Sequence, residues 1–152
     1  MKKICFISSS GGHLDQLMML KPIMEKYDSF IVTEKVKYSS IKNSNKVYYL
    51  YQVNRIEKIW ILKMILNTFI SIYIFLVQRP NIVISTGALS TIPLCLISKL
   101  FMKKLIFIES FAKINTPTLT GKLLYKFADK FYVQWEEMLK IYPKADFKGG
   151  IY

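Results

Sequence analysis

Short apolar runs alternate with segments of helical pattern along the whole chain. The runs predict five or six strands, at 4–7, 29–33, 46–51, 81–85, 105–108 and 130–133. Helices are expected at 13–24, 55–78, 118–127 and 134–137 and around Pro93, with a polar loop at 34–45. Pro22 should kink or restart the first helix. This alternation indicates an α/β fold with a Rossmann-like, doubly wound parallel sheet, whose ligands bind at the carboxyl ends of the strands.

The first predicted strand runs into a small, flexible turn and then directly into a helix. The turn contains Ser10, Gly11 and Gly12, and His13 follows at the start of the helix. Because these turn residues are small, their backbone N–H groups can approach a ligand closely, and the unpaired N–H groups of a helix start attract anions. The junction predicts a phosphate-type binding site, with a purely structural tight turn as the alternative.

Two further turns are expected at the same edge of the sheet. Thr86 and Gly87 follow the fourth predicted strand, and Glu109 and Ser110 follow the fifth. Because parallel strands end along one edge, we expect these residues to lie close to His13. Three separate turns that meet at one edge indicate a site more strongly than any one of them.

Two side chains are candidates for catalysis. His13 is the only histidine of the chain, and its ordinary pKa suits proton transfer near neutral pH. It could act as a general base toward an acceptor hydroxyl or donate a hydrogen bond to a phosphate. Glu109 could hold a sugar hydroxyl or orient His13. The alternatives are a structural helix-cap histidine and a surface carboxylate near Lys113.

The segment 59–77 is almost entirely apolar, and only a helix suits it. Lys63 and the few other polar residues fall close to one line on the helix, so most of the circumference is apolar. Three interpretations compete: a core helix, a helix lying in a membrane interface, and a membrane span. A span is disfavoured because a lysine in mid-segment costs about 2.5 to 3.5 kcal/mol and because strands of one sheet flank the helix.

We favour the interfacial arrangement, with a buried core helix as the close alternative. Trp60, Tyr73 and nearby lysines, Lys63 among them, would then lie at the level of the lipid headgroups. Ile65 and Ile72 belong to the apolar surface, and charges placed there should abolish membrane binding.

The net charge of the chain narrows the classes of partner that it could bind. Twenty-two Lys and Arg against ten Asp and Glu give the 152-residue chain a net charge of +12. Such a charge suits nucleic acid, an anionic membrane or a phosphorylated substrate. The lysines are spread along the chain and form no dense basic run, so nucleic-acid binding is the weakest of the three.

Several other site types are disfavoured. The turn at Gly11 lacks the third glycine of a dinucleotide fingerprint, and Gly121 is not part of a complete phosphate-binding P-loop, which argues against NAD binding and ATP hydrolysis. Two isolated cysteines, Cys5 and Cys95, and one histidine cannot form a structural zinc site, so we expect no metal. Both cysteines are expected to be buried, reduced thiols. The chain shows no signal peptide, which indicates a cytosolic location.

Six motifs, in order along the chain, resemble a single family. They are 10–13, 80–88, 108–110, 119–125, 128–129 and 134–135. The family is the membrane-recruiting subunit of the split UDP-N-acetylglucosamine transferase of asparagine-linked glycosylation. Its bacterial relatives are described as enhancer subunits of capsular polysaccharide β-1,4-glycosyltransferases. A more distant likeness is to the amino-terminal half of the GT-B transferase that makes lipid II.

The resemblance implies that 1–152 is a single Rossmann-like domain on the acceptor side of a two-chain glycosyltransferase. The UDP-sugar donor would bind mainly to a separate chain, with no cofactor held tightly here, and this chain would be inactive or weak alone. The acceptor would be a lipid-diphosphate-linked saccharide in capsular or exopolysaccharide biosynthesis, at the cytoplasmic face of the plasma membrane. His13 and Gly12 would face the acceptor diphosphate or the transferred sugar, and Thr86, Gly87 and Glu109 would line the same cleft.

One alternative function remains for a member of this family. The chain could be a non-catalytic membrane scaffold that recruits and activates a separate catalytic chain. Animal and fungal members of the family carry an N-terminal membrane anchor, whereas this chain begins at its first predicted strand. Membrane attachment is therefore expected from the 59–77 helix together with basic charge, or from the partner chain.

Overall fold

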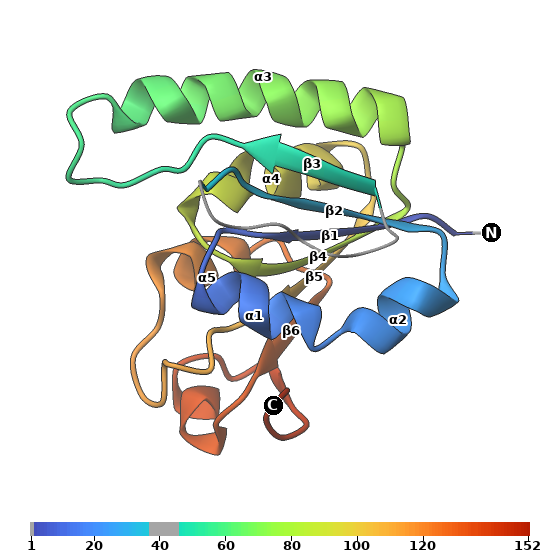
Figure 1. The fold of residues 1–152 in the computed structure, drawn as a ribbon. Helices are drawn as coiled ribbons and strands as arrows, with labels where there is room; N and C mark the ends of the chain where they lie inside the picture. Colours follow the sequence, from blue (N-terminus) through green and yellow to red (C-terminus); the bar gives the residue numbers. More distant parts are fainter. Residues whose placement is uncertain (1, 37–45) are drawn as a thin grey trace.

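Seven parallel strands form one sheet in the order β3-β2-β1-β4-β5-β6-β7 (Figure 1). The strands are β1 Ile4–Ser8, β2 Ser29–Glu34, β3 Lys46–Leu50, β4 Ile82–Gly87, β5 Lys104–Ile108, β6 Lys130–Val133 and β7 Asp146–Phe147. The computed structural model describes residues 2–36 and 46–152, so most of the predicted loop at 34–45 lies outside the described residues. The doubly wound parallel sheet is confirmed. The sequence did not reveal β7, which has only two residues.

The helices connect these strands. They are α1 Gly12–Met18, α2 Lys21–Lys26, α3 Trp60–Gln78, α4 Ile92–Leu100, α5 Leu119–Leu124 and the 3₁₀-helices η1 Leu89–Thr91 and η2 Glu136–Lys140. Pro22 lies in the first turn of α2 and restarts the helix there, as predicted. The long helix begins at Trp60 rather than at residue 55, because the preceding residues form turns in which Ile56 N donates to Asn54 Oδ1 at 3.1 Å.

Two hydrophobic cores cover the two faces of the sheet. Figure 1 shows α3 on one side of the sheet and α1 with α2 on the other. Alternate strand residues serve the two faces: Cys5 and Ile7 of β1 belong to the core that includes α3, α4 and α5, and Phe6 belongs to the core under α1 and α2. Cys5 and Cys95 are free, buried thiols, as predicted, and burial raises the pKa of Cys95 to about 12.

The polar residues of α3 face the protein. Asn67 and Ser71 are fully buried. The Asn67 amide binds both backbone groups of Tyr51, accepting from its N–H at 2.8 Å and donating to its carbonyl at 2.9 Å. Ile74 and Phe75 are the only apolar residues of α3 in the buried core. The helix therefore inverts the usual arrangement, in which polar residues face water.

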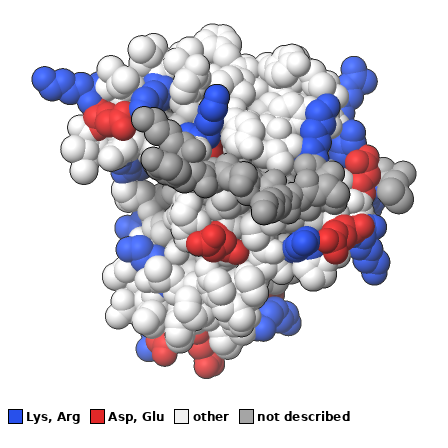
Figure 2. Space-filling model, in the orientation of Figure 1, with Lys and Arg blue, Asp and Glu red and all other residues white. Residues whose placement is uncertain are grey.

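The opposite side of α3 is apolar and exposed. The exposed large apolar residues of the helix are Ile61, Leu62, Ile65, Leu66, Phe69, Ile72, Tyr73, Leu76 and Val77. Figure 2 shows an uncharged surface along α3, with Lys and Arg side chains near its two ends. The alternative of a buried core helix is therefore wrong. Within residues 2–36 and 46–152, α3 is the one helix long and apolar enough to cross a membrane, yet strands of the same sheet hold both its ends.

Candidate functional site

The turns after β1 and β4 meet where the direction of the strand order reverses. These two strands are neighbours, but α1 packs on one face of the sheet and α4 on the other. The Ser9 N–H donates to the Gly87 carbonyl at 2.7 Å, and the Ala88 N–H donates to Ser9 Oγ at 3.2 Å. In open α/β sheets the crevice at such a switch point binds the ligand. The sequence-predicted residues Ser10 to His13 and Thr86 to Gly87 all lie at this point.

His13 is fixed to the β4 turn by two hydrogen bonds. Its Nδ1 lies 2.7 Å from the Thr86 carbonyl oxygen, and Thr86 Oγ1 donates to the His13 carbonyl at 2.8 Å. Because a carbonyl only accepts, Nδ1 carries the hydrogen, and Nε2 of the neutral ring remains an acceptor. Among the described residues, no side chain or backbone group bonds Nε2. The structure thus places a free acceptor nitrogen at the switch point.

The glycines keep this part of the site open. Gly11 has a φ of +71°, and neither it nor Gly12 would bring an added Cβ within 4 Å of another atom. Both residues are exposed, so the backbone here is open to an incoming ligand. Gly87 has a φ of +92°, and an added Cβ there would lie 3.5 Å from Nδ1 of His13. That distance is an ordinary van der Waals contact, so it is the positive φ of the turn that favours glycine at 87.

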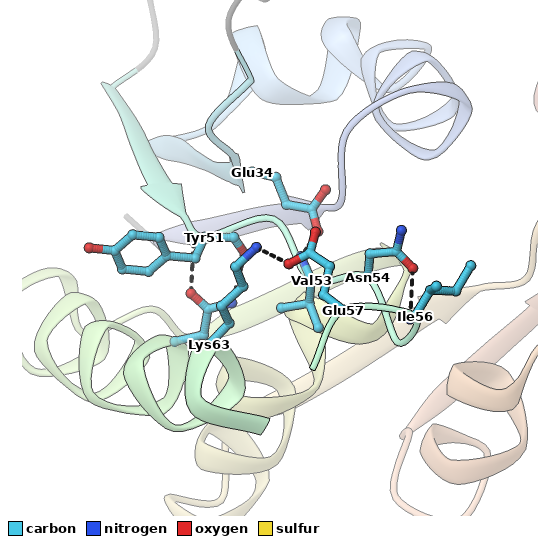
Figure 3. Close-up of polar contacts among 8 residues, drawn as sticks. Glu34, Tyr51, Val53, Asn54, Ile56, Glu57 and Lys63 are labelled. Carbon is cyan, nitrogen blue, oxygen red and sulfur yellow. Dashed lines mark hydrogen bonds and ion pairs between the residues drawn. The ribbon is translucent and has the colours of Figure 1, made fainter. Parts of the chain in front are cut away.

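Glu34, which the sequence analysis placed in a loop, holds the glycine-rich turn. It is the buried last residue of β2, and its Oε2 accepts from Ser10 N at 3.1 Å and from Ser10 Oγ at 2.8 Å. Its Oε1 accepts from Val53 N at 3.3 Å, in the connection to α3 (Figure 3). The one sequence signal was a carboxylate directly after an apolar strand. Glu34 thus joins the turn of the candidate site to the segment that leads into α3.

Glu109 is buried beneath the site. Its Oε1 accepts from Ser110 N at 2.9 Å and Thr118 Oγ1 at 2.8 Å, and its Oε2 accepts from Thr118 N at 3.2 Å and the Tyr142 hydroxyl at 2.9 Å. Burial and the neighbouring Glu109 carboxylate raise the pKa of Tyr142. Two expectations are therefore wrong: Glu109 is not a surface carboxylate, and it does not orient His13, because the Thr86 carbonyl does so.

Two glutamines, which sequence reasoning missed, fix the backbone after β5. Gln16 of α1 and Gln134 after β6 both donate to the Glu109 carbonyl, at 3.2 and 2.8 Å. Gln16 Oε1 also accepts from Phe111 N at 3.2 Å. Both glutamines are buried. The segment after β5 is thereby held against α1, beside His13.

These residues surround a hollow of about 400 Å³. Its walls are formed by Gly12, His13, Gln16, Ser110, Phe111, Ala112 and Tyr152. The predicted residues Gly12, His13 and Ser110 therefore share one hollow, as expected from their strand ends. Within the described parts of the chain, no three His, Cys, Asp or Glu side chains gather in a way that could hold a metal ion.

The residues predicted for membrane association lie on α3, outside this hollow. Ile65, Ile72 and Tyr73 are exposed, whereas Trp60 and Lys63 are half-buried. Lys63 forms an ion pair with Glu57, which precedes α3 (Figure 3). Its charge is therefore partly neutralised within the protein, unlike that of a lysine free to bind headgroups.

Comparisons with known proteins show which sequences and folds the chain is similar to. The family model described as "Oligosaccharide biosynthesis protein Alg14 like" matches residues 4–151. The UDP-N-acetylglucosamine transferase subunit ALG14 of Yarrowia lipolytica is 26% identical over 172 residues, covering 97% of this chain and 80% of its own length. The ALG14 subunit of Rattus norvegicus is 27% identical over 178 residues, with 97% and 82% covered.

Among solved structures, MurG of Acinetobacter baumannii superimposes with a TM-score of 0.70 at 13% identity. The match covers 90% of this chain but 43% of MurG. The fold is therefore that of one Rossmann-like half of a GT-B protein. The chain spans less than half of that solved structure.

Proposed function

Because this chain belongs to the Alg14 family of oligosaccharide biosynthesis proteins, we propose that it is the acceptor-side, membrane-associated subunit of a two-chain glycosyltransferase. The complex transfers a sugar from a UDP-sugar to a lipid-diphosphate-linked saccharide. We assign the reaction to capsular or exopolysaccharide biosynthesis at the cytoplasmic face of the plasma membrane, following the bacterial enhancer subunits that the motifs resemble. The chain alone is inactive or weak.

The proposal is supported mainly by one observation. The switch point between β1 and β4 is open to solvent, and it belongs to one half of a GT-B fold. His13 and the glycine-rich turn lie at the carboxyl edge of the sheet, and the chain covers 43% of the MurG structure. In GT-B enzymes the active site lies between two such halves. This chain covers 80 and 82% of two relatives that are named transferase subunits. We therefore infer that a separate chain binds the UDP-sugar and closes over this edge to complete the cleft.

His13 supplies the base in this proposal. The acceptor hydroxyl gives its proton to Nε2 while its oxygen bonds to the anomeric carbon of the donor sugar. The UDP oxygen leaves with the electrons of the broken bond, and the anomeric configuration inverts. The Thr86 carbonyl keeps the hydrogen on Nδ1 and so keeps Nε2 available.

The open backbone at Gly11 and Gly12 suits the acceptor diphosphate, because small residues let N–H groups approach phosphate oxygens. Ser110 lies on the same hollow and suits a sugar hydroxyl. Glu109 takes a different part from the one expected. Its carboxylate already accepts four hydrogen bonds from within the chain, so we assign it the positioning of residues 110 to 118 rather than a step in catalysis.

Membrane association is assigned to the exposed apolar side of α3. A helix that buries Asn67 and Ser71 and exposes Ile61, Ile65 and Ile72 leaves an apolar surface that water does not favour. Lying along the membrane interface removes this surface from water while both helix ends stay attached to the sheet. Trp60 and Tyr73 would then lie at headgroup level.

The proposal is tested by purifying the tagged full-length chain from its own host's membranes in mild detergent. We expect a second protein with a nucleotide-sugar-binding half-domain to co-elute in stoichiometric amount. A chain that elutes alone and binds UDP-sugars unaided would refute the two-chain assignment. In the complex, a silent His13→Ala variant would instead favour the non-catalytic scaffold.

A further inference from the structure

We propose that the turn at the end of α4, formed by its last residue, Leu100, and by Phe101 and Met102, is a second membrane-insertion point that acts together with α3 on an anionic bilayer surface. The inference deepens the membrane association of the proposed function and rests on it. The turn lies outside the residues predicted from the sequence to bind the membrane.

The turn displays three large apolar side chains in succession. Leu100 is 79% exposed, Phe101 50% and Met102 91%. Single exposed apolar residues are ordinary on protein surfaces, but contiguous apolar patches mark interaction sites. Because all three lie at the tip of one short connection, they form a small apolar projection.

This projection adjoins the C-terminal end of α3. The Phe101 ring lies 4.9 Å from the ring of Phe75, in the last part of α3. Leu76 and Val77, the neighbours of Phe75 in sequence, are exposed. The turn therefore lies beside the C-terminal end of α3, where exposed apolar residues of the helix also lie.

Backbone hydrogen bonds hold the turn in place without the side chains of Leu100 and Met102. The Met102 N–H donates to the Lys99 carbonyl at 2.9 Å, and the Lys103 N–H donates to the Ser98 carbonyl at 2.8 Å, which closes α4 with a Schellman motif. Met102 has a φ of +54°, in the left-handed region where glycine or asparagine is usual at this position. Because the Met102 side chain is almost fully exposed, it adds little packing to the fold. The side chain is free to enter a non-aqueous phase or to bind a partner.

The charges around the turn indicate whether its apolar side chains enter a membrane or bind a protein. Lys99 precedes the apolar triplet, and Lys103 and Lys104 follow it. Lys99 is paired with Asp129 at 2.8 Å, whereas no ion pair is seen for Lys103 or Lys104 among the described residues. Apolar side chains with lysines directly beside them suit a bilayer, where the former enter the acyl region and the latter bind anionic headgroups. We therefore assign the turn to an anionic membrane rather than to a protein partner.

Vesicle flotation tests the assignment with the full chain. The vesicles are phosphatidylcholine with and without about 30% phosphatidylglycerol, which gives a negative surface. The test variant is Leu100→Asp with Met102→Asp, because aspartate is tolerated at left-handed positions. The matched control is Met19→Asp with Ile23→Asp, whose side chains are 47% and 40% exposed on α1–α2, on the other face of the sheet. Circular dichroism and thermal melting confirm that each variant folds.

We expect the turn variant to lose at least about tenfold in partitioning to the anionic vesicles and the control to lose none. Lys103→Gln with Lys104→Gln should weaken binding to anionic vesicles by about fivefold per lysine and leave the weak binding to neutral vesicles unchanged. A turn variant that floats like the wild type would overturn the inference. If that variant also failed to bind the partner chain, the turn would be a protein contact and not a membrane contact.

A third variant separates this inference from the proposed function. Ile65→Glu with Ile72→Glu places charges on α3 itself. Loss of flotation in the α3 variant alone would leave the membrane function standing and refute the part given to the turn. Normal flotation of both variants would refute membrane association through this face altogether.

Discussion

Nδ1 of His13 lies 2.7 Å from the carbonyl oxygen of Thr86, so the backbone after β4 sets the tautomer of the only histidine in the chain. Residues 73 positions apart in the sequence thereby form one unit at the switch point of the sheet. The unit leaves Nε2 as the free acceptor. Each element of the proposed mechanism depends on this pairing.

Replacement of His13 by alanine should stop sugar transfer without dissolving the complex. We expect the transfer rate of the assembled pair to fall by roughly 10²- to 10⁴-fold, the usual contribution of a general base. Size-exclusion chromatography of the variant with its partner checks assembly, and a labelled-sugar assay checks turnover. Turnover near the wild-type rate would remove His13 from catalysis.

Glu34→Gln should loosen the glycine-rich turn. Glutamine can keep one oxygen on Ser10, but it then turns its amide toward the Val53 N–H, so one donor loses its acceptor. We expect a loss of about 1 kcal/mol in the free energy of unfolding, measured by urea denaturation, and faster hydrogen exchange at Ser10. Glu25→Gln is the control, because Glu25 is exposed and its ion pair joins it to Lys21, the first residue of the same helix. Equal exchange at Ser10 in both variants would contradict the role of Glu34.

Glu109→Gln should destabilise the protein although the shape is preserved. Both carboxylate oxygens accept two hydrogen bonds, so either orientation of the amide turns an NH₂ group toward two donors. We expect a loss of about 1 to 3 kcal/mol in the free energy of unfolding. Tyr142→Phe, which removes one of the four donors, should cost less. A Glu109→Gln variant as stable as the wild type would show that the buried carboxylate is dispensable.

The ion pair of Asp129 should make stability depend on pH in the acid range. Partial burial raises the pKa of Asp129, but hydrogen bonds from Lys99 and the Leu105 N–H outweigh it and hold the pKa below its ordinary value of 3.8. Because the folded-state pKa is lowered, the stabilisation is complete above the unfolded value and is lost as pH falls through the folded value. The wild type should therefore exceed Asp129→Asn in melting temperature from pH 7 down to about 4 and lose this advantage below it. An advantage that persists in strong acid would rule out the carboxylate as its source.

The strands and the switch point could be predicted from the sequence because their signals are local. Apolar runs specify buried parallel strands, and small residues directly after β1 and β4 specify the turns. The two-residue strand β7 carries no such run. Its pairing with β6 depends on tertiary packing, which a local pattern does not contain.

The contacts that complete the site could not be predicted, since they join distant positions. Gln16 binds the backbone of residues 93 and 95 positions away, and Glu34 binds Ser10, 24 positions away. The residue types glutamine and glutamate do not by themselves indicate which distant groups they will bind. The polar line on α3 was visible in the sequence, but its direction was not, because Asn67 turns inward to satisfy the backbone of Tyr51.

The central claim is that this chain supplies the acceptor side of a reaction that needs a second chain. The most direct measurement is the transfer of labelled sugar from UDP-sugars to a lipid-diphosphate-linked saccharide, by this chain, by its co-purified partner and by the pair. The account predicts rapid transfer by the pair only, and its loss in the pair that contains His13→Ala. Transfer by this chain alone at the rate of the pair would contradict it.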